Sequence, residues 1–196
     1  DHVEATEDLR AHFGCRVIGA SADAHRLPDL DLAVADGDTF QTCGLDIKVM
    51  DVSGHTIGHI AFHAPDAAAA FTADSLMALG CGRLFEGTPA QMWDSLSKLR
   101  ALPDGTIIYS GHEYTAANGR FAMTIEPTNP VLQTLIDAIA TARAAGKPTV
   151  PSSLALEKAT NPFLRAHLPV LKAALSMSDA SDVAVFTEIR ARKDAF

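Results

Sequence analysis

The chain of 196 residues lacks long hydrophobic segments, paired cysteines and an excess of basic residues. No apolar run reaches the ~18 residues that a membrane span requires, so we expect no membrane association. The three cysteines are scattered and form no Cys-x-x-Cys pair, which excludes a disulfide framework and favours a reducing cytoplasm. A formal net charge of −8 argues against a nucleic-acid partner, because binding to a phosphate backbone needs a basic face.

The composition is that of a globular protein, with 47% hydrophobic and 20% charged residues. Its length suits one domain, or one domain with a small extension, and we expect a monomer. The chain opens on Asp1 and His2 without an initiator methionine and continues directly into a helical pattern. This start predicts that an N-terminal part is missing.

Local patterns predict a strand-rich first half followed by helices. Strands are expected at residues 15–20, 29–40, 45–52, 59–65, 67–76 and 105–113, and the strand within residues 29–40 is expected to end in an Asp-Gly turn. Helices are expected at residues 3–13, 88–102, 115–125, 130–145, 165–175 and 181–194. Thr88 is a typical N-cap, and Pro89 suits the first helical position. This order predicts an α/β core over residues 1–113 and an α-helical domain over residues 114–196.

Three polar residues fall where predicted strands end. His55, Asp74 and His112 each follow an apolar strand beside Gly or Ala. A single His at such a position is more often a hydrogen-bonded surface residue, and a single Asp is more often a turn former. Together they are hard to explain as core residues, because a buried carboxylate must be paired. A divalent cation bound by imidazole and carboxylate would satisfy all three.

Sequence motifs in a fixed order carry a family resemblance. They are SGHTIGH, FTADSL, GCGRLFEGT and SGHEYT, at residues 53–59, 71–76, 80–88 and 110–115. In this order they resemble the metallo-β-lactamase superfamily and, within it, glyoxalase II, the hydroxyacylglutathione hydrolases. The segments at residues 148–165 and 190–196 are similar to the helical domain of that family. The resemblance covers the whole chain and implies an αββα sandwich, with its N-terminal part missing, plus a C-terminal α-helical domain.

The resemblance also implies a site for two divalent metal ions, with zinc favoured and iron or manganese as alternatives. Asp1, His2 and His112 would bind one ion. His55 would bind the other with two histidines that precede this sequence, and Asp74 would bridge both ions. Asp1 and Asp74 are then the implied catalytic residues, because they hold and orient the hydroxide that the two ions share.

Three further residues are expected to have structural roles. His59 would brace the loop that carries His55, and His63 would be an ordinary strand residue. No cysteine nucleophile is needed when a metal-activated water attacks, so Cys81 is interpreted as structural.

The implied reaction is hydrolysis of S-(2-hydroxyacyl)glutathione thioesters, most simply S-D-lactoylglutathione to D-lactate and glutathione. Because glutathione has two carboxylates, an acidic protein needs a local basic pocket to bind it. The resemblance assigns this pocket to Arg83, Tyr114, Arg190 and Lys193. For Arg190 and Lys193 the alternative is an exposed basic helix end, favoured by the helix dipole. Phe85 stands where many relatives have Tyr, which removes one hydroxyl from the pocket.

Two other functions stay open at this stage. One is a different enzyme on the same fold, either a persulfide dioxygenase with one iron or a lactonase. The other is a catalytically silent metal-binding or interaction module, which would bind at most one ion.

Overall fold

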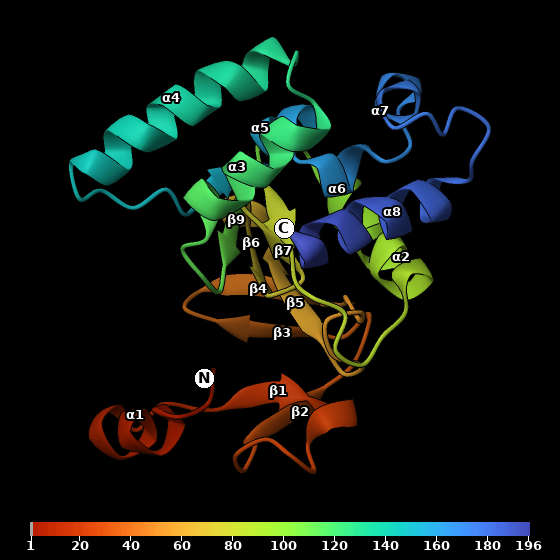
Figure 1. The fold of residues 1–196 in the computed structure, drawn as a ribbon. Helices are drawn as coiled ribbons and strands as arrows, with labels where there is room; N and C mark the ends of the chain where they lie inside the picture. Colours follow the sequence, from red (N-terminus) through yellow and green to blue (C-terminus); the bar gives the residue numbers. More distant parts are fainter. Residues whose placement is uncertain (1) are drawn as a thin grey trace.

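The computed structural model describes residues 2–196, and its centre is a six-stranded sheet with the order β10-β9-β6-β5-β4-β3 (Figure 1). The strands are β3 (Thr39–Thr42), β4 (Leu45–Asp51), β5 (Ile60–Ala64), β6 (Ala69–Ala73), β9 (Ile107–Ser110) and β10 (Ser152–Ser153). Neighbouring strands are antiparallel except for β6 and β9, which are parallel. Because parallel strands end at the same edge of a sheet, the residues that follow β6 and β9 lie together.

One α-helix precedes this sheet in the described chain, and further α-helices pack on the sheet and on one another (Figure 1). They are α1 (Thr6–Phe13), α2 (Pro89–Arg100), α3 (Thr115–Ile125), α4 (Pro130–Ala144), α5 (Leu154–Thr160), α6 (Pro162–Arg165), α7 (Pro169–Ala174) and α8 (Asp182–Ala195). The predicted start of α2 is confirmed. Thr88 accepts a hydrogen bond from the Gln91 backbone N–H, and the Gln91 side chain accepts one from the Thr88 N–H. None of the helices in residues 2–196 is long and apolar enough to cross a membrane.

Two small sheets complete the fold. Strands β1 (Ile18–Ala20) and β2 (Leu32–Val34) pair in parallel, and β7 (Leu76–Met77) forms a hairpin with β8 (Gly80–Cys81). Together with α1, the β1–β2 pair lies at the opposite end of the molecule from the C-terminal helices (Figure 1).

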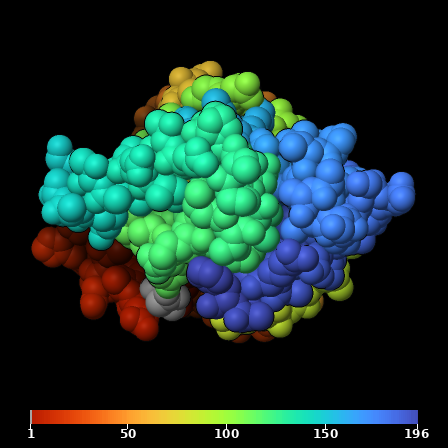
Figure 2. Space-filling model, turned by 45° about the horizontal axis from the view of Figure 1, so that its top comes forward, coloured from red at the N-terminus to blue at the C-terminus, as the bar shows by residue number. Residues whose placement is uncertain are grey.

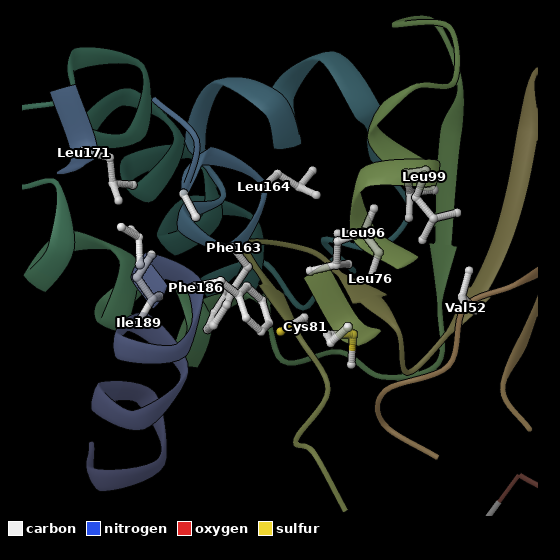
Figure 3. Packing of buried hydrophobic residues seen from close by; sticks show 14 of the residues in the cluster. Val52, Leu76, Cys81, Leu96, Leu99, Phe163, Leu164, Leu171, Phe186 and Ile189 are labelled. Carbon is white, nitrogen blue, oxygen red and sulfur yellow. The ribbon is translucent and has the colours of Figure 1, made fainter. Parts of the chain in front are cut away.

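The main core joins one face of the sheet to helices from both halves of the chain. Leu96 of α2, Phe163 of α6 and Phe186 of α8 are fully buried in one cluster, and the two phenylalanine rings meet edge to face at 5.8 Å (Figure 3). Truncating such a residue to Ala costs about 2–5 kcal/mol. The first and second halves of the chain therefore share a single core.

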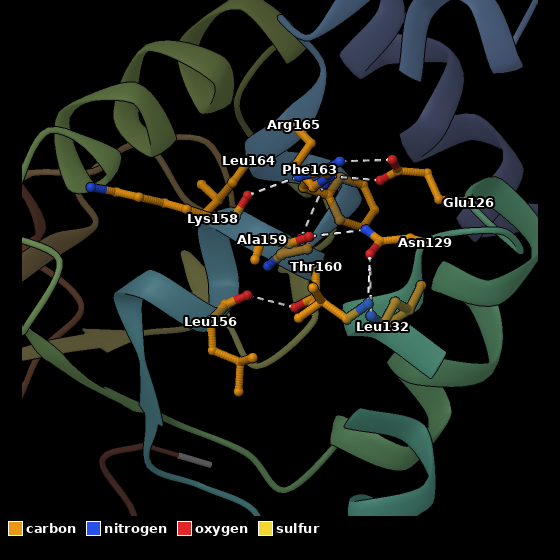
Figure 4. A network of polar contacts seen from close by, with 12 residues as sticks. Glu126, Asn129, Leu132, Leu156, Lys158, Ala159, Thr160, Phe163, Leu164 and Arg165 are labelled. Carbon is orange, nitrogen blue, oxygen red and sulfur yellow. Dashed lines mark hydrogen bonds and ion pairs between the residues drawn. The ribbon is translucent and has the colours of Figure 1, made fainter. Parts of the chain in front are cut away.

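Polar contacts lock the C-terminal helices to one another. Arg165 at the end of α6 makes two parallel contacts with the Glu126 carboxylate, from Nε at 2.7 Å and from Nη2 at 2.9 Å (Figure 4). The Asn129 side chain accepts from the first turn of α4 and donates to the Ala159 carbonyl of α5. Because the Arg165–Glu126 pair is bidentate and nearly buried, it fixes the end of α3 against α6.

Three predicted elements were wrong in extent. The strand expected at residues 29–40 is limited to the three residues of β2. The expected Asp-Gly turn follows it, with Gly37 at φ 82° and the Asp38 carboxylate accepting from the Ala35 N–H, and the separate strand β3 after this turn was not predicted. The helix expected at residues 165–175 is shortened to α7, because Pro169 occupies its first turn and Arg165 already ends α6. The strand expected at residues 15–20 is reduced to the three residues of β1, of which Ile18 and Gly19 are partly exposed and Ala20 is buried.

The helix α5 was not predicted, although its N-cap Ser153 is a recognisable signal. The start of α6 was not predicted either, although Asn161 caps it and Pro162 occupies its first position.

Candidate active site

Three histidines surround one buried carboxylate at the edge where β6 and β9 end. Asp74 follows β6 and His112 lies just beyond β9. The Nε2 atoms of His2, His112 and His55 lie 3.1, 3.2 and 3.6 Å from Asp74 Oδ2. One ligand atom each from His2, Asp74 and His112 lies within 4.8 Å of the others. The structure thus brings together four of the five predicted metal ligands.

This arrangement fits a divalent cation. Asp74 is 5% exposed, and its Oδ1 atom is buried without a hydrogen-bond partner among the described residues. A buried carboxylate oxygen of this kind is costly unless a proton donor or a cation faces it. Imidazole nitrogens with carboxylate oxygens are the donor set of zinc and of other first-row metals. The fifth predicted ligand, Asp1, lies outside the described residues.

Two glycines make this close approach possible. A Cβ atom on Gly111 would lie 2.6 Å from both Asp74 Oδ1 and His2 Cε1. A Cβ atom on Gly82 would lie 2.2 Å from the Asp74 carbonyl oxygen and 2.8 Å from His55 Nδ1. Both positions therefore require glycine for the ligands to converge.

The loop that carries His55 is held from two sides. His55 Nδ1 donates to the Arg83 carbonyl at 2.7 Å, which leaves Nε2 directed at Asp74 as a ligand atom. The Glu86 carboxylate accepts from the Ile57 backbone N–H at 2.8 Å and from Arg26 Nη2 at 3.0 Å. The Arg26 hydrogen bond, followed by that of Ile57, lowers the pKa of Glu86 to about 2. Glu86 thus remains an acceptor for this loop.

His59 contacts both the backbone of Asp74 and the loop that carries His55, in line with the structural role expected for it. Its Nε2 accepts from the Asp74 backbone N–H at 3.2 Å, and its Nδ1 lies 3.1 Å from Thr56 Oγ1. Burial, followed by the charge of His55, lowers the pKa of His59 to about 4. A neutral His59 can keep its acceptor nitrogen on Asp74. His63 lies in β5, as expected for an ordinary strand residue.

A cavity of about 720 Å³ extends from the histidine cluster to the C-terminal helices. All four residues predicted for substrate binding line it, namely Arg83, Tyr114, Arg190 and Lys193. The Tyr114 ring stacks on His112 with centroids 4.8 Å apart and planes within 9°. This ring contact links the histidine cluster to the part of the cavity that would hold the substrate.

Arg190 and Lys193 differ in their surroundings. Arg190 is 4% exposed, donates to the Cys81 carbonyl at 3.1 Å and pairs with Asp194 at 2.8 Å. The alternative of an exposed basic helix end is therefore wrong for Arg190. The Lys193 ammonium lies 5.2 and 5.3 Å from the ring centroids of Phe121 and Phe196. Burial, and then the charge of Arg190, lowers the pKa of Lys193.

Cys81 and Arg120 also belong to the cavity wall. Burial raises the pKa of the Cys81 thiol to about 11, so the thiol stays protonated and has the structural role that was expected. Arg120 was not predicted as a site residue. An exposed arginine in a helix has no local signal that distinguishes it from other surface charges.

Comparisons with known proteins identify the family of this chain. The model of the metallo-beta-lactamase superfamily matches residues 1–112, and that of the hydroxyacylglutathione hydrolase C-terminus matches residues 113–196. Hydroxyacylglutathione hydrolases from Roseobacter denitrificans and Jannaschia sp. are each 63% identical over all 196 residues, which span 77% of each relative. One from Brucella anthropi is 52% identical, with 75% of its length covered.

Solved structures show the same fold. ETHE1 from Myxococcus xanthus is 25% identical with a TM-score of 0.61, covering 97% of this chain and 64% of that protein. The BLEG-1 B3 metallo-beta-lactamase has the same TM-score at 19% identity, covering 84% of this chain and 72% of that protein. The fold and site are those of a divalent-metal-binding member of the metallo-β-lactamase superfamily. Within it, the chain belongs to the hydroxyacylglutathione hydrolase family, as the motifs predict.

Proposed function

We propose that this protein hydrolyses S-(2-hydroxyacyl)glutathione thioesters, with S-D-lactoylglutathione as substrate and D-lactate and glutathione as products. The observation that carries the proposal is one continuous cavity with a histidine–carboxylate cluster at one end and cationic side chains at the other. Residues 1–113 would form the catalytic core, and residues 114–196 the helical domain that completes the substrate site.

Two divalent ions, zinc in the first instance, are proposed for the site. Asp1, His2 and His112 would hold one ion, His55 would belong to the other, and Asp74 would contact both. When bound, such ions lower the pKa of water and polarise a carbonyl group. The residues present supply acceptor atoms for this, because three imidazole Nε2 atoms face Asp74 Oδ2.

The protein's own residues orient the ligands and the substrate. His59 and the Arg83 carbonyl fix the directions of Asp74 and His55 through hydrogen bonds. Tyr114 stacks on His112 and limits its rotation. In the reaction, water adds to the thioester carbonyl, the C–S bond breaks, and the sulfur leaves with a proton as the glutathione thiol.

The test compares D74A with D94A, a matched control because Asp94 is an exposed residue of α2 that pairs with Lys98. We expect D74A to lose bound metal and to hydrolyse S-D-lactoylglutathione at least about 100-fold more slowly, since a metal ligand is removed. D94A should keep both properties. The measurements are elemental analysis of the purified protein and the loss of thioester absorbance.

Three results would count against the proposal. D74A with unchanged metal content and hydrolysis would show that Asp74 is not a ligand. Unaltered protein that binds metal but hydrolyses no glutathione thioester would favour a silent metal-binding module, and oxygen uptake with glutathione persulfide would favour a dioxygenase.

A further inference from the structure

The end of the cavity remote from the histidines has an excess of positive charge. Four cationic side chains line the cavity: Arg83, Arg120, Arg190 and Lys193. Among the described lining residues, the carboxylates are Asp74, at the metal end, and Asp194. Four cations thus share one local carboxylate, although the protein as a whole has a net charge of −8.

Asp194 is occupied by two of these cations. Its Oδ1 accepts from Arg190 Nη2 at 2.8 Å and from Arg190 Nε at 3.2 Å, and it lies 3.7 Å from Arg83 Nε. Arg190 also donates to the Cys81 carbonyl. Its guanidinium is therefore largely satisfied by the protein.

Arg120 and Lys193, in contrast to Arg190, are not neutralised by a paired carboxylate side chain in the described chain. Within residues 2–196, neither side chain forms an ion pair with a carboxylate. Arg120 lies on α3 and Lys193 on α8, and these helices lie against each other (Figure 2). The two charges are close enough to interact, because the charge of Arg120 contributes to the lowered pKa of Lys193. Two neighbouring cations that form no ion pair with a carboxylate side chain of the described residues are a natural site for an anionic ligand.

We propose that Arg120 is a specificity-determining residue that binds, together with Lys193, a carboxylate of the glutathione part of the substrate. This inference rests on the proposed function. The thioester must lie at the histidine end to react, so the carboxylates of glutathione reach toward the cationic end. A guanidinium can bind a carboxylate through two parallel hydrogen bonds, which an ammonium cannot do.

The test compares the metal-loaded protein with R120A, R120K and R192A. Arg192 is a matched control because it pairs with Glu188 on α8 and does not line the cavity. We expect R120A to raise KM for S-D-lactoylglutathione about tenfold, as for the loss of a charge-assisted hydrogen bond. Its kcat should stay within about twofold, since the residue does not touch the reacting atoms. R120K should recover part of the affinity, and R192A should equal the unaltered protein.

A substrate with both carboxylates esterified separates recognition from structure. The S-D-lactoylglutathione diethyl ester keeps the thioester and lacks the charges, so R120A and the unaltered protein should hydrolyse it with equal KM. Equal loss on both substrates would show a structural effect and overturn the proposal. So would an unchanged KM of R120A for the charged substrate.

Calorimetric binding of S-methylglutathione, which has no thioester, tests Arg120 independently of the reaction. We expect R120A to weaken this binding about tenfold. An unaltered protein that binds S-methylglutathione through Arg120 and yet hydrolyses no thioester would refute the proposed function while supporting Arg120. Equal binding by R120A and the unaltered protein would refute the role of Arg120, whatever the activity.

Discussion

The buried carboxyl of Glu157 should make the stability of this protein depend on pH. Glu157 lies in α5 and is 1% exposed. One of its oxygens, Oε2, accepts from the Leu79 backbone N–H at 2.8 Å and from Asn161 Nδ2 at 3.0 Å. Burial raises the pKa of Glu157 from 4.5 to about 7, and the hydrogen bonds offset only part of that increase.

The sign of the effect follows from proton binding. Between pH 4.5 and about 7 the folded protein keeps a proton on Glu157 that the unfolded chain has released. The stabilisation is therefore complete below pH 4.5, declines as the pH rises and is lost above about pH 7. A shift from 4.5 to about 7 corresponds to about 3 kcal/mol of unfolding free energy, at 1.36 kcal/mol per unit.

The substitution Glu157→Gln isolates this effect, because an amide has the shape of a protonated carboxyl and does not titrate. Its oxygen can accept the bonds from Leu79 and Asn161. Urea unfolding of metal-free protein from acidic to mildly alkaline pH would measure both chains. We expect E157Q to gain about 3 kcal/mol relative to the unaltered protein as the pH rises through this window.

The control is E188Q, the same change at an exposed residue of α8, which should follow the pH profile of the unaltered protein. Parallel profiles for E157Q and the unaltered protein would refute the reasoning, because Glu157 would then have the same pKa in both states.

Two further predictions concern the metal site. G111A should weaken metal binding at least about tenfold, because its Cβ would lie 2.6 Å from two ligand side chains, whereas G105A, with nothing within 4 Å of its Cβ, should not. Competition with a chromophoric chelator measures both, and equal affinities would contradict the geometry. E86A should lower kcat/KM about tenfold, because the Ile57 N–H loses its acceptor and the His55 loop loosens. Steady-state kinetics of E86A beside E188A, an exposed control, would test this, and equal losses in the two would exclude a specific role for Glu86.

The elements with local signals were predictable from the sequence. Thr88 and Pro89 mark the start of α2, and Gly14, in the left-handed conformation, marks the end of α1. The short helix α6 depends instead on tertiary packing, which buries Phe163 and Leu164 against α2 and α8. Packing of this kind overrides weak helical propensity, and a single sequence does not show it.

The ligand cluster was predictable because the strand topology places the ligand residues close together. His55, Asp74 and His112 each follow a strand, and the parallel pairing of β6 with β9 places the last two at one sheet edge. His2 is different, since it precedes α1 and has no strand to place it. Only the resemblance to the family indicated its role, and its 3.1 Å contact with Asp74 is a long-range feature of the fold.

The roles within the cationic wall depend on contacts that helical spacing does not determine. Arg190 and Lys193 are three residues apart on α8 and share a helix face, and the family resemblance, not this spacing, assigns both to the same pocket. Asp194 lies four residues after Arg190 and neutralises it, whereas Lys193 faces two aromatic rings. Replacing Arg190 would leave the Cys81 carbonyl and Asp194 without a partner, and stability would fall together with binding. Arg120 has no such contacts, so its substitution reports on ligand recognition alone.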